Sequence, residues 1–210
     1  NSLGRKWELT FTTLVLFGGA LFAAFPKFYS TSFGGAYWVW ILILFTFVIQ
    51  AVSYEFRSKP DNLLGTQAYD AFLFVNGSIG ILLIGAAVGT FFTGSNFTLN
   101  ASNPVTWTNR LRGVEAAFSV FNVSLGLFLV FNARVIGAMY LVNNIDFNGL
   151  PDFEQRLRKA CLMNLIYALP FLLIVLFGLL TMDGFGFDAT GKVSMVPHKY
   201  LLNLLAMPVV

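Results

Sequence analysis

Cysteine, histidine and charged residues are scarce in this sequence. Its 210 residues contain one cysteine, one histidine and 11% charged residues. The single cysteine, Cys161, excludes an internal disulfide and a zinc or iron–sulfur cluster built by this chain alone. The single histidine, His198, cannot supply paired axial ligands to a haem, and no Cys-x-x-Cys-His attachment site is present. We therefore expect this chain alone to bind no cofactor and no metal ion, and to contain no catalytic residue.

Sequence signals of soluble enzymes and of nucleic-acid binding are missing as well. There is no phosphate-binding glycine loop, no nucleophile elbow and no group of closely spaced metal ligands. The formal net charge is only +3, and the basic residues are spread over the predicted loops rather than gathered into a patch. This distribution argues against a nucleic acid as a partner.

Apolar residues dominate the composition. Hydrophobic residues make up 57% of the chain, and phenylalanine alone contributes 24 residues. Apolar runs of about 20 residues recur, which is the length that a helix needs to cross a bilayer. The alternating pattern of a transmembrane strand is absent, so helices must satisfy the backbone hydrogen bonds in lipid. The sequence therefore predicts an all-α fold, a polytopic transmembrane helical bundle.

The apolar runs divide residues 1–210 into about five complete transmembrane helices and the start of a sixth, within a single membrane domain. The predicted helices are at about 9–25, 35–56, 68–93, 113–143, 157–181 and from 199 onward. The predicted loops between them are 27–34, 57–66, 94–112, 144–156 and 183–198. Pro26 marks the stop of the first helix, because proline cannot continue it.

Basic residues near the predicted helix ends indicate the orientation of the chain. One side holds Arg5, Lys6, Arg57, Lys59, Arg156, Arg158 and Lys159. The other side holds Lys27, Arg110, Arg112, Lys192 and Lys199. Because short cytoplasmic loops are enriched in lysine and arginine, we expect the first side to be cytoplasmic.

Small residues in the predicted third helix indicate close helix packing. Gly85 and Gly89 have the small-xxx-small spacing that lets two helix backbones approach each other. Spacing alone leaves open whether the neighbouring helix belongs to this chain or to a partner subunit, and we favour a contact within the chain.

Ionisable residues inside or beside membrane helices are the first candidates for chemistry. Glu8 lies beside Trp7 at the cytoplasmic mouth of the first predicted helix, and Thr12 lies one turn further on the same face. A carboxyl group there could take up protons and pass them inward through hydroxyl groups and water. The same residues also suit an ordinary interfacial helix start, where glutamate offsets the helix dipole and tryptophan anchors in the headgroups.

A second group of charges lies at the end of the second predicted helix. Glu55, Arg57 and Asp70 are expected to crowd the same membrane surface. We predict that they form an ion-paired rim that fixes helix ends, rather than a catalytic group.

Two stretches of the sequence resemble a known family. Gly18-Gly19-Ala20-Leu21-Phe22-Ala23-Ala24-Phe25-Pro26, followed about thirty residues later by Glu55-Phe56-Arg57-Ser58-Lys59, resembles the second subunit of cytochrome bd-type quinol oxidases. The similarity continues through Gly85–Gly94, through Asp183-Gly184-Phe185 and into Tyr200–Val210. It covers essentially the whole chain, and the start of the sequence is most similar to a Bacteroidetes-like variant.

The resemblance implies a haem-free membrane subunit of a respiratory quinol:dioxygen oxidoreductase. It implies a heterodimer with a haem-bearing subunit I that holds haem b and haem d, oxidises quinol and reduces dioxygen to water in an electrogenic reaction. It also implies a multi-pass location in the bacterial cytoplasmic (inner) membrane, in contact with lipid and quinone. Menaquinol would suit the Bacteroidetes-like variant.

The resemblance also implies a role for the start of the first helix. An acidic residue after tryptophan at this place is associated with a proton path from the cytoplasm, and Trp7-Glu8 match it by position, with Thr12 beyond them. Members of the family more often have Asp followed by Gly where this chain has Glu8-Leu9. We also expect the sequence to be a fragment that lacks a preceding helix and a C-terminal part.

Two other functions remain open from the residues alone. A small secondary transporter or permease domain would be favoured by broken helices, but Pro170 has no matching break in a repeated half. A purely structural assembly subunit would result if Glu8 takes no part in proton transfer.

Overall fold

A computed structural model describes residues 2–99, 105–147, 149, 151–187 and 191–206. The side chains of residues 2–8, 10, 11 and 99 lie outside this description. The chain forms two compact units, Asn1–Asn122 and Val123–Val210.

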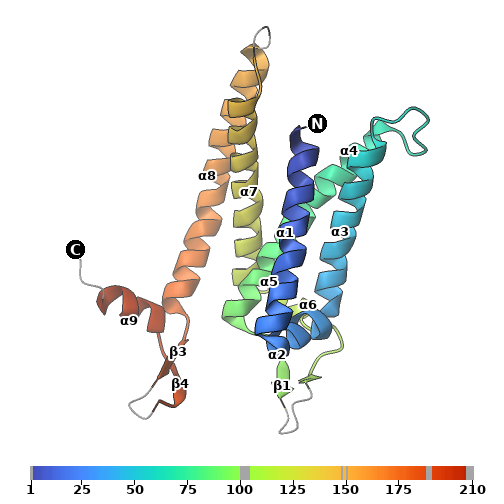
Figure 1. Ribbon diagram of the computed structural model, residues 1–210. Helices are drawn as coiled ribbons and strands as arrows, with labels where there is room; N and C mark the ends of the chain where they lie inside the picture. Colours follow the sequence, from blue (N-terminus) through green and yellow to red (C-terminus); the bar gives the residue numbers. More distant parts are fainter. Residues whose placement is uncertain (1, 100–104, 148, 150, 188–190, 207–210) are drawn as a thin grey trace. The chain divides into compact units, whose positions relative to one another are not determined.

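Helices make up most of the first unit (Figure 1). Its elements, in chain order, are α1 (Ser2–Ala24), α2 (Pro26–Tyr29), the π-helical turn η1 (Ser30–Gly35), α3 (Tyr37–Phe56), α4 (Thr66–Val75), the π-helical turn η2 (Asn76–Gly80), α5 (Ile81–Thr93), β1 (Phe97–Leu99), β2 (Val105–Trp107), α6 (Val114–Ala117) and the first residues of α7 (Val120–Asn144). Pro26 ends α1 and opens α2, because its ring fixes a helical φ but removes a hydrogen-bond donor.

The core of the first unit lies between α3 and the continuous helical segment α4–η2–α5. Val39 and Ile43 of α3 are buried together with Ala87 of α5, and partly buried apolar side chains pack around them. Gly80 of η2 lies against α3, because a Cβ atom at this position would lie 2.7 Å from Thr46 Oγ1. Small residues therefore bring these helices into close contact, as their role in membrane helix packing leads one to expect.

Gly89 of α5 makes a second close contact, with Asn122 at the start of α7. A Cβ atom on Gly89 would lie 2.9 Å from Asn122 Cγ and 3.0 Å from Asn122 Cα. Gly85 and Gly89 are both buried. The predicted contact of this glycine-rich face within the chain is thus confirmed for Gly89.

The second unit contains two long helices that run side by side (Figure 1). They are the main part of α7 and α8 (Pro151–Thr181), followed by β3 (Gly184–Phe187), β4 (Val193–Val196) and α9 (Lys199–Ala206). Phe131 of α7 stacks on Phe171 of α8 with ring centroids 5.7 Å apart, and it also contacts Tyr167. Aromatic contacts therefore join the two helices.

Several predicted boundaries are corrected by the structure. The predicted loop 27–34 is helical, forming α2 and η1. The predicted loops 94–112 and 183–198 contain the antiparallel hairpins β1–β2 and β3–β4. The fifth predicted helix begins at Pro151 instead of 157, since proline suits the first helical position and Asp152 and Glu154 stabilise the first turn.

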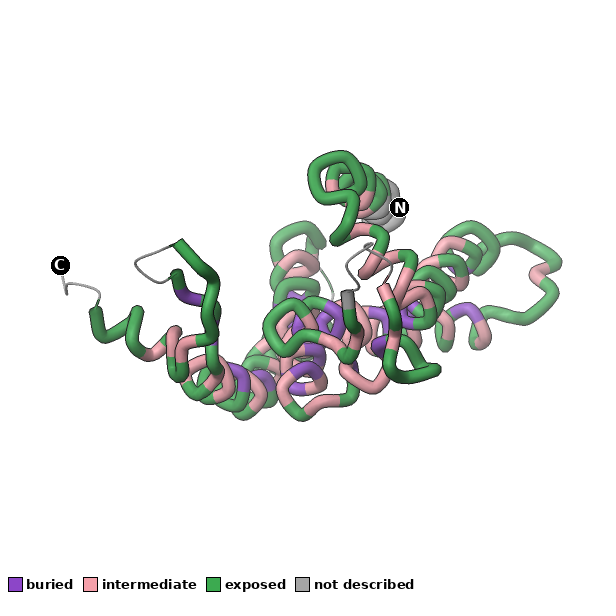
Figure 2. The backbone as a smooth tube through the Cα atoms, turned by 90° about the horizontal axis from the view of Figure 1, so that it is seen from below, coloured by how far each residue is buried: buried purple, intermediate pink, exposed green. Residues whose placement is uncertain are grey.

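The predicted all-α transmembrane class is confirmed. In the part of the chain that the structure describes, four helical segments are long and apolar enough to cross a membrane, namely Tyr37–Phe56, Thr66–Thr93, Val120–Asn144 and Pro151–Thr181. Only 11% to 28% of the most apolar window of each is buried, and Figure 2 shows the largely exposed helix faces. These faces require lipid or another subunit as their surroundings. Helix α1 contains a shorter apolar segment, Thr12–Ala24, so its status as a complete span stays a prediction.

The Gly89–Asn122 contact yields a test of the packing. Gly89→Ala places a methyl group where Asn122 already lies, so we expect the protein to lose about 1–3 kcal/mol of stability through overpacking. The matched control is Gly137→Ala in α7, where a Cβ atom meets nothing within 4 Å. The control should gain up to about 1 kcal/mol, because alanine favours the helix more than glycine does. Thermal unfolding in mild detergent, followed by tryptophan fluorescence, measures both, and equal midpoints for the two variants would contradict this packing.

Candidate functional site

The predicted proton-entry residues lie near the start of α1. Trp7 and Glu8 belong to this helix, but their side chains lie outside the described residues. Thr12 follows Glu8 by four residues, which puts both on one face of the helix, and its side chain is exposed. The neighbouring Thr13 donates its hydroxyl hydrogen to the carbonyl of Leu9 at 2.8 Å. The roles of Trp7, Glu8 and Thr12 therefore stay predictions.

An ion-paired rim joins the end of α3 to the start of α4, as the sequence predicts. Arg57 Nε donates to Asp70 Oδ1 at 2.5 Å, and Arg57 Nη2 donates to Asp70 Oδ2 at 3.1 Å. Lys59 Nζ donates to Glu55 Oε1 at 2.5 Å, one helical turn away. The two-pronged geometry of the Arg57–Asp70 pair fixes the ends of two helices relative to each other.

Electrostatics keep Arg57 charged. Its hydrogen bond to Asp70 and the negative charge of that carboxylate raise the pKa of the guanidinium above its usual value. Both side chains of the pair are about half exposed, at 45% and 51%. The pair is thus a screened surface contact that positions helices, and it has the character of a structural rim rather than of a reaction centre.

Asn122 is a buried polar residue that the sequence reasoning missed. Its side chain is fully buried, and Nδ2 donates to Thr93 Oγ1 at 2.9 Å and to the Ala116 carbonyl at 2.7 Å. An asparagine in an apolar run, with glycine on the facing helix, is the signal that could have found it. These bonds tie the end of α5 to the start of α7 within the first unit.

Two buried hydroxyl groups of α3 bond to their own helix. Thr46 Oγ1 donates to the Ile43 carbonyl at 2.7 Å, and Ser53 Oγ donates to the Ile49 carbonyl at 2.6 Å. Each therefore has its donor satisfied locally, which lowers the cost of burying a polar group in an apolar bundle.

Three side-chain atoms in the described residues are buried without a hydrogen-bond partner: Gln50 Oε1, Trp107 Nε1 and Glu115 Oε1. The other carboxylate oxygen of Glu115, Oε2, accepts the backbone N–H of Gly113 at 3.2 Å. Glu115 therefore holds the turn before α6.

The sequence limits how this chain could ligate a haem. A haem with two imidazole ligands needs two histidines, and the sequence has one. That residue, His198, is exposed just before α9 and has a positive φ of 52°. Among the described residues, no group of three His, Cys, Asp or Glu side chains lies close enough together to hold a metal ion.

The membrane-length helices, packed through glycine and small residues, define the class of protein. The chain is a polytopic α-helical integral membrane protein. It belongs to the family of the cytochrome bd terminal oxidase subunit II, whose model matches residues 1–210. The resemblance read from the Gly18–Pro26 and Glu55–Lys59 stretches is thereby confirmed.

Curated relatives agree with this assignment. The chain is 33% identical over 108 residues to the probable cytochrome oxidase subunit 2 of Haemophilus influenzae, which covers 51% of this chain and 29% of that protein. It is 28% identical over 148 residues to the cytochrome bd-I ubiquinol oxidase subunit 2 of Escherichia coli K12, covering 67% and 39% respectively. It is 26% identical over 159 residues to the cytochrome bd ubiquinol oxidase subunit 2 of Bacillus subtilis, covering 76% and 44%. The matched stretches are thus less than half of each relative.

The ion-paired rim can be tested by exchanging its charges. Arg57→Asp places two carboxylates together, so we expect a lower thermal midpoint of the purified protein than in the wild type. Adding Asp70→Arg restores opposite charges and should recover most of the loss. The effect of the single variant should shrink in about 0.5 M salt, because the pair is exposed and screened. A double variant no more stable than the single one would show that the pair does not position these helices.

Proposed function

We propose that this chain is part of the haem-free second subunit of a bd-type quinol:dioxygen oxidoreductase. The observation that carries the proposal is the match of the subunit II family model along residues 1–210. The relatives in Escherichia coli and Bacillus subtilis are named as ubiquinol oxidase subunits, which supports a quinol as the substrate class. This family assignment favours an oxidase subunit over the transporter or permease alternative.

The catalytic groups of the complex belong, on this proposal, to a partner. A haem-bearing subunit I would pair with this subunit as a heterodimer, and its haem b and haem d would supply electron transfer and dioxygen reduction. The single, exposed His198 supports this division of labour, because it leaves the described residues without a second imidazole. This chain would contribute helix faces that support the partner and contact lipid or the isoprenoid tail of quinone.

The location and orientation follow from the same reasoning. The apolar helices support a multi-pass subunit of the bacterial cytoplasmic (inner) membrane. The Arg57–Lys59 end of α3 would face the cytoplasm, because this side has the denser basic clusters. The opposite end, with the β1–β2 hairpin, would face outward.

Proton entry is the chemical role that this chain's own residues would perform. Reduction of dioxygen to two waters consumes four electrons and four protons, so the complex needs a proton supply. Glu8, near the proposed cytoplasmic end of α1, would take a proton from water and release it inward. Trp7 would hold the helix end at the interface, and the Thr12 hydroxyl would relay the proton one turn further.

Replacing the carboxyl group of Glu8 in an active complex tests both the oxidase assignment and the proton-entry role. The intact wild-type complex, reconstituted in liposomes, should consume dioxygen when quinol is added and should translocate charge. Glu8→Gln cannot exchange a proton, so we expect turnover and charge translocation to fall by about tenfold or more. Glu8→Asp should retain most of the activity, because it keeps a titratable carboxyl group.

The matched control is Glu55→Gln, which makes the same chemical change at an exposed carboxylate of the rim. It should leave turnover close to wild type. Unchanged turnover in Glu8→Gln would remove Glu8 from proton entry and leave a structural subunit. A wild-type complex without quinol-dependent oxygen uptake would overturn the oxidase assignment itself.

A further inference from the structure

Two cavities of different chemical character meet at Trp107 in the first unit. The cationic cavity has a volume of about 600 Å³ and is lined by Ser30, Asn109, Arg110 and Arg112, among others. The apolar cavity has a volume of about 210 Å³ and is lined largely by aromatic and small residues. The indole of Trp107 forms a wall of both. A polar space and an apolar space thus lie next to each other.

Arg110 and Arg112 give the cationic cavity its charge. Both arginines follow β2 in a turn that is closed by hydrogen bonds from the Leu111 and Arg112 N–H groups to Asn109. Neither arginine forms an ion pair with a carboxylate of the described residues. Two uncompensated guanidinium groups on one cavity wall attract an anion, and guanidinium geometry suits a phosphate.

The apolar cavity offers contacts that suit hydrocarbon. Phe28 and Phe91 meet edge to face with ring centroids 5.3 Å apart, and Phe97 lies 5.5 Å from the Trp107 ring. Ala36 and the small residues at the end of α5 complete much of the remaining wall. Thr31, Ser32, Thr90 and Ser95 also line this cavity, so an alkyl chain placed here would contact mainly the aromatic rings, with hydroxyl-bearing side chains beside them.

Trp107 is held in its place by glycines. A Cβ atom on Gly35 would lie 2.7 Å from Trp107 Nε1, and a Cβ atom on Gly113 would lie 3.3 Å from Trp107 Cζ3. The strand register pairs Trp107 with Phe97. The wall between the two cavities is therefore built by close packing against η1 and the turn before α6.

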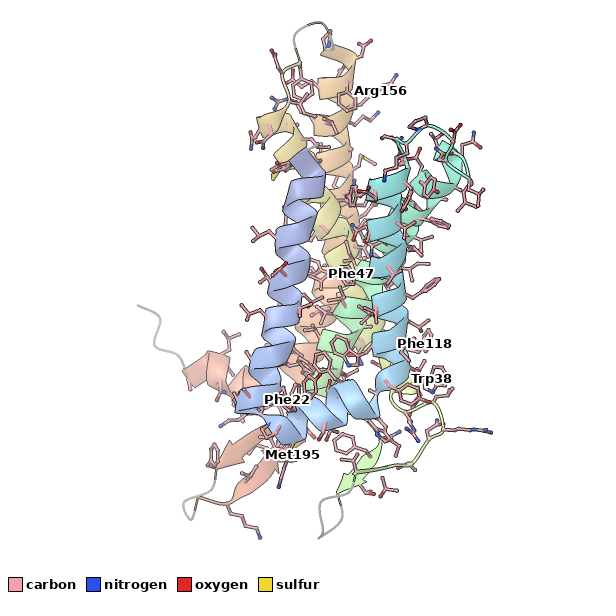
Figure 3. All side chains as sticks on the ribbon, turned by 45° about the vertical axis from the view of Figure 1, so that its right-hand side comes forward. Phe22, Trp38, Phe47, Phe118, Arg156 and Met195 are labelled. Carbon is pink, nitrogen blue, oxygen red and sulfur yellow. The ribbon has the colours of Figure 1, made fainter. Side chains whose placement is uncertain are left out.

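The cavities lie at the depth where lipid headgroups are expected. Helix α3 begins at Tyr37, and the Arg112 guanidinium lies 5.3 Å from the centroid of the Tyr37 ring. Figure 3 shows the exposed aromatic side chains of Trp38 and Phe118 at this same end of α3. Aromatic residues of this kind mark the interface between hydrocarbon and water. A phosphate at Arg110 and Arg112 would thus be level with the headgroup layer.

We propose that these two cavities bind one anionic phospholipid of the leaflet at this face. Its phosphate lies in the cationic cavity between Arg110 and Arg112, and one acyl chain passes Trp107 into the apolar cavity. A free phosphate would leave the apolar cavity unused, and a quinone ring has no charge for the two arginines to bind. A phospholipid matches both halves of the site at once.

Native mass spectrometry of the intact complex, supplied with phosphatidylglycerol, tests the site. Arg110→Gln combined with Arg112→Gln removes both charges, and we expect the affinity for the tightest bound phosphatidylglycerol to fall about tenfold or more. Replacing both arginines by lysine should retain part of the binding. The matched control, Arg156→Gln combined with Lys159→Gln in α8, also removes two positive charges, in the second unit, and should keep the lipid.

Each other outcome decides against the proposal. Retention of the lipid by the double glutamine variant, or equal occupancy by phosphatidylcholine, would show that the arginines do not select an anionic lipid. Displacement of phosphatidylglycerol by inorganic phosphate would show that the site takes a free anion. Loss of a partner subunit from the double variant would identify the surface as a protein interface.

A single variant keeps the test valid if the double variant fails to fold. Arg110 is exposed and forms no hydrogen bond or ion pair with a described residue, so Arg110→Gln removes no contact described for the folded chain. Its thermal midpoint should equal that of the wild type while its affinity for phosphatidylglycerol falls. An unchanged affinity would overturn the proposal.

Discussion

The absence of water in the membrane interior is the constraint on which the rest of this structure depends. Every backbone N–H and C=O group at that depth needs a partner within the protein, and helices provide it without neighbouring strands. The hydrophobic effect then contributes little to joining helices in lipid, so association depends on close packing and a few polar contacts. The contacts of Gly80 with Thr46 and of Gly89 with Asn122 combine close packing with a polar side chain.

Several of the polar groups buried in this environment have specific hydrogen-bond partners. Asn122 of α7 donates hydrogen bonds to Thr93 of α5 and to the Ala116 carbonyl of α6. Thr46 and Ser53 instead donate their hydroxyl hydrogens to carbonyl groups of their own helix, α3. The charged pair Arg57–Asp70 lies at the helix ends, where both side chains are partly exposed. Outward-facing apolar surface remains extensive on α3 and α8, as expected of a subunit surrounded by lipid and partner chains.

Much of the fold could be predicted, because the length of an apolar run and the residues that end it are local properties of the sequence. The stop at Pro26, the end of α3 at Phe56 and the Arg57 rim follow from short stretches of sequence. The η1 segment and the β1–β2 hairpin could not be found in this way, because strand register and π turns depend on packing against distant residues such as Trp107. The same holds for Asn122, whose partners come from two other elements. At the proposed proton-entry site, the sequence identifies Trp7 and Glu8 as candidates. A proton relay also needs groups on other helices that face them, and the spacing of residues along one helix does not identify those groups.

The central claim is that this chain serves a haem-bearing quinol oxidase whose cofactors lie in another subunit. The most direct measurement is the reduced-minus-oxidised visible spectrum of the full-length protein, purified in mild detergent from its native membrane with whatever copurifies. The account predicts reduced b-type bands and a red-shifted d-type band that accompany a second polypeptide and vanish when this subunit is isolated. A colourless protein without a second polypeptide, or haem bands that stay with the isolated subunit, would contradict it.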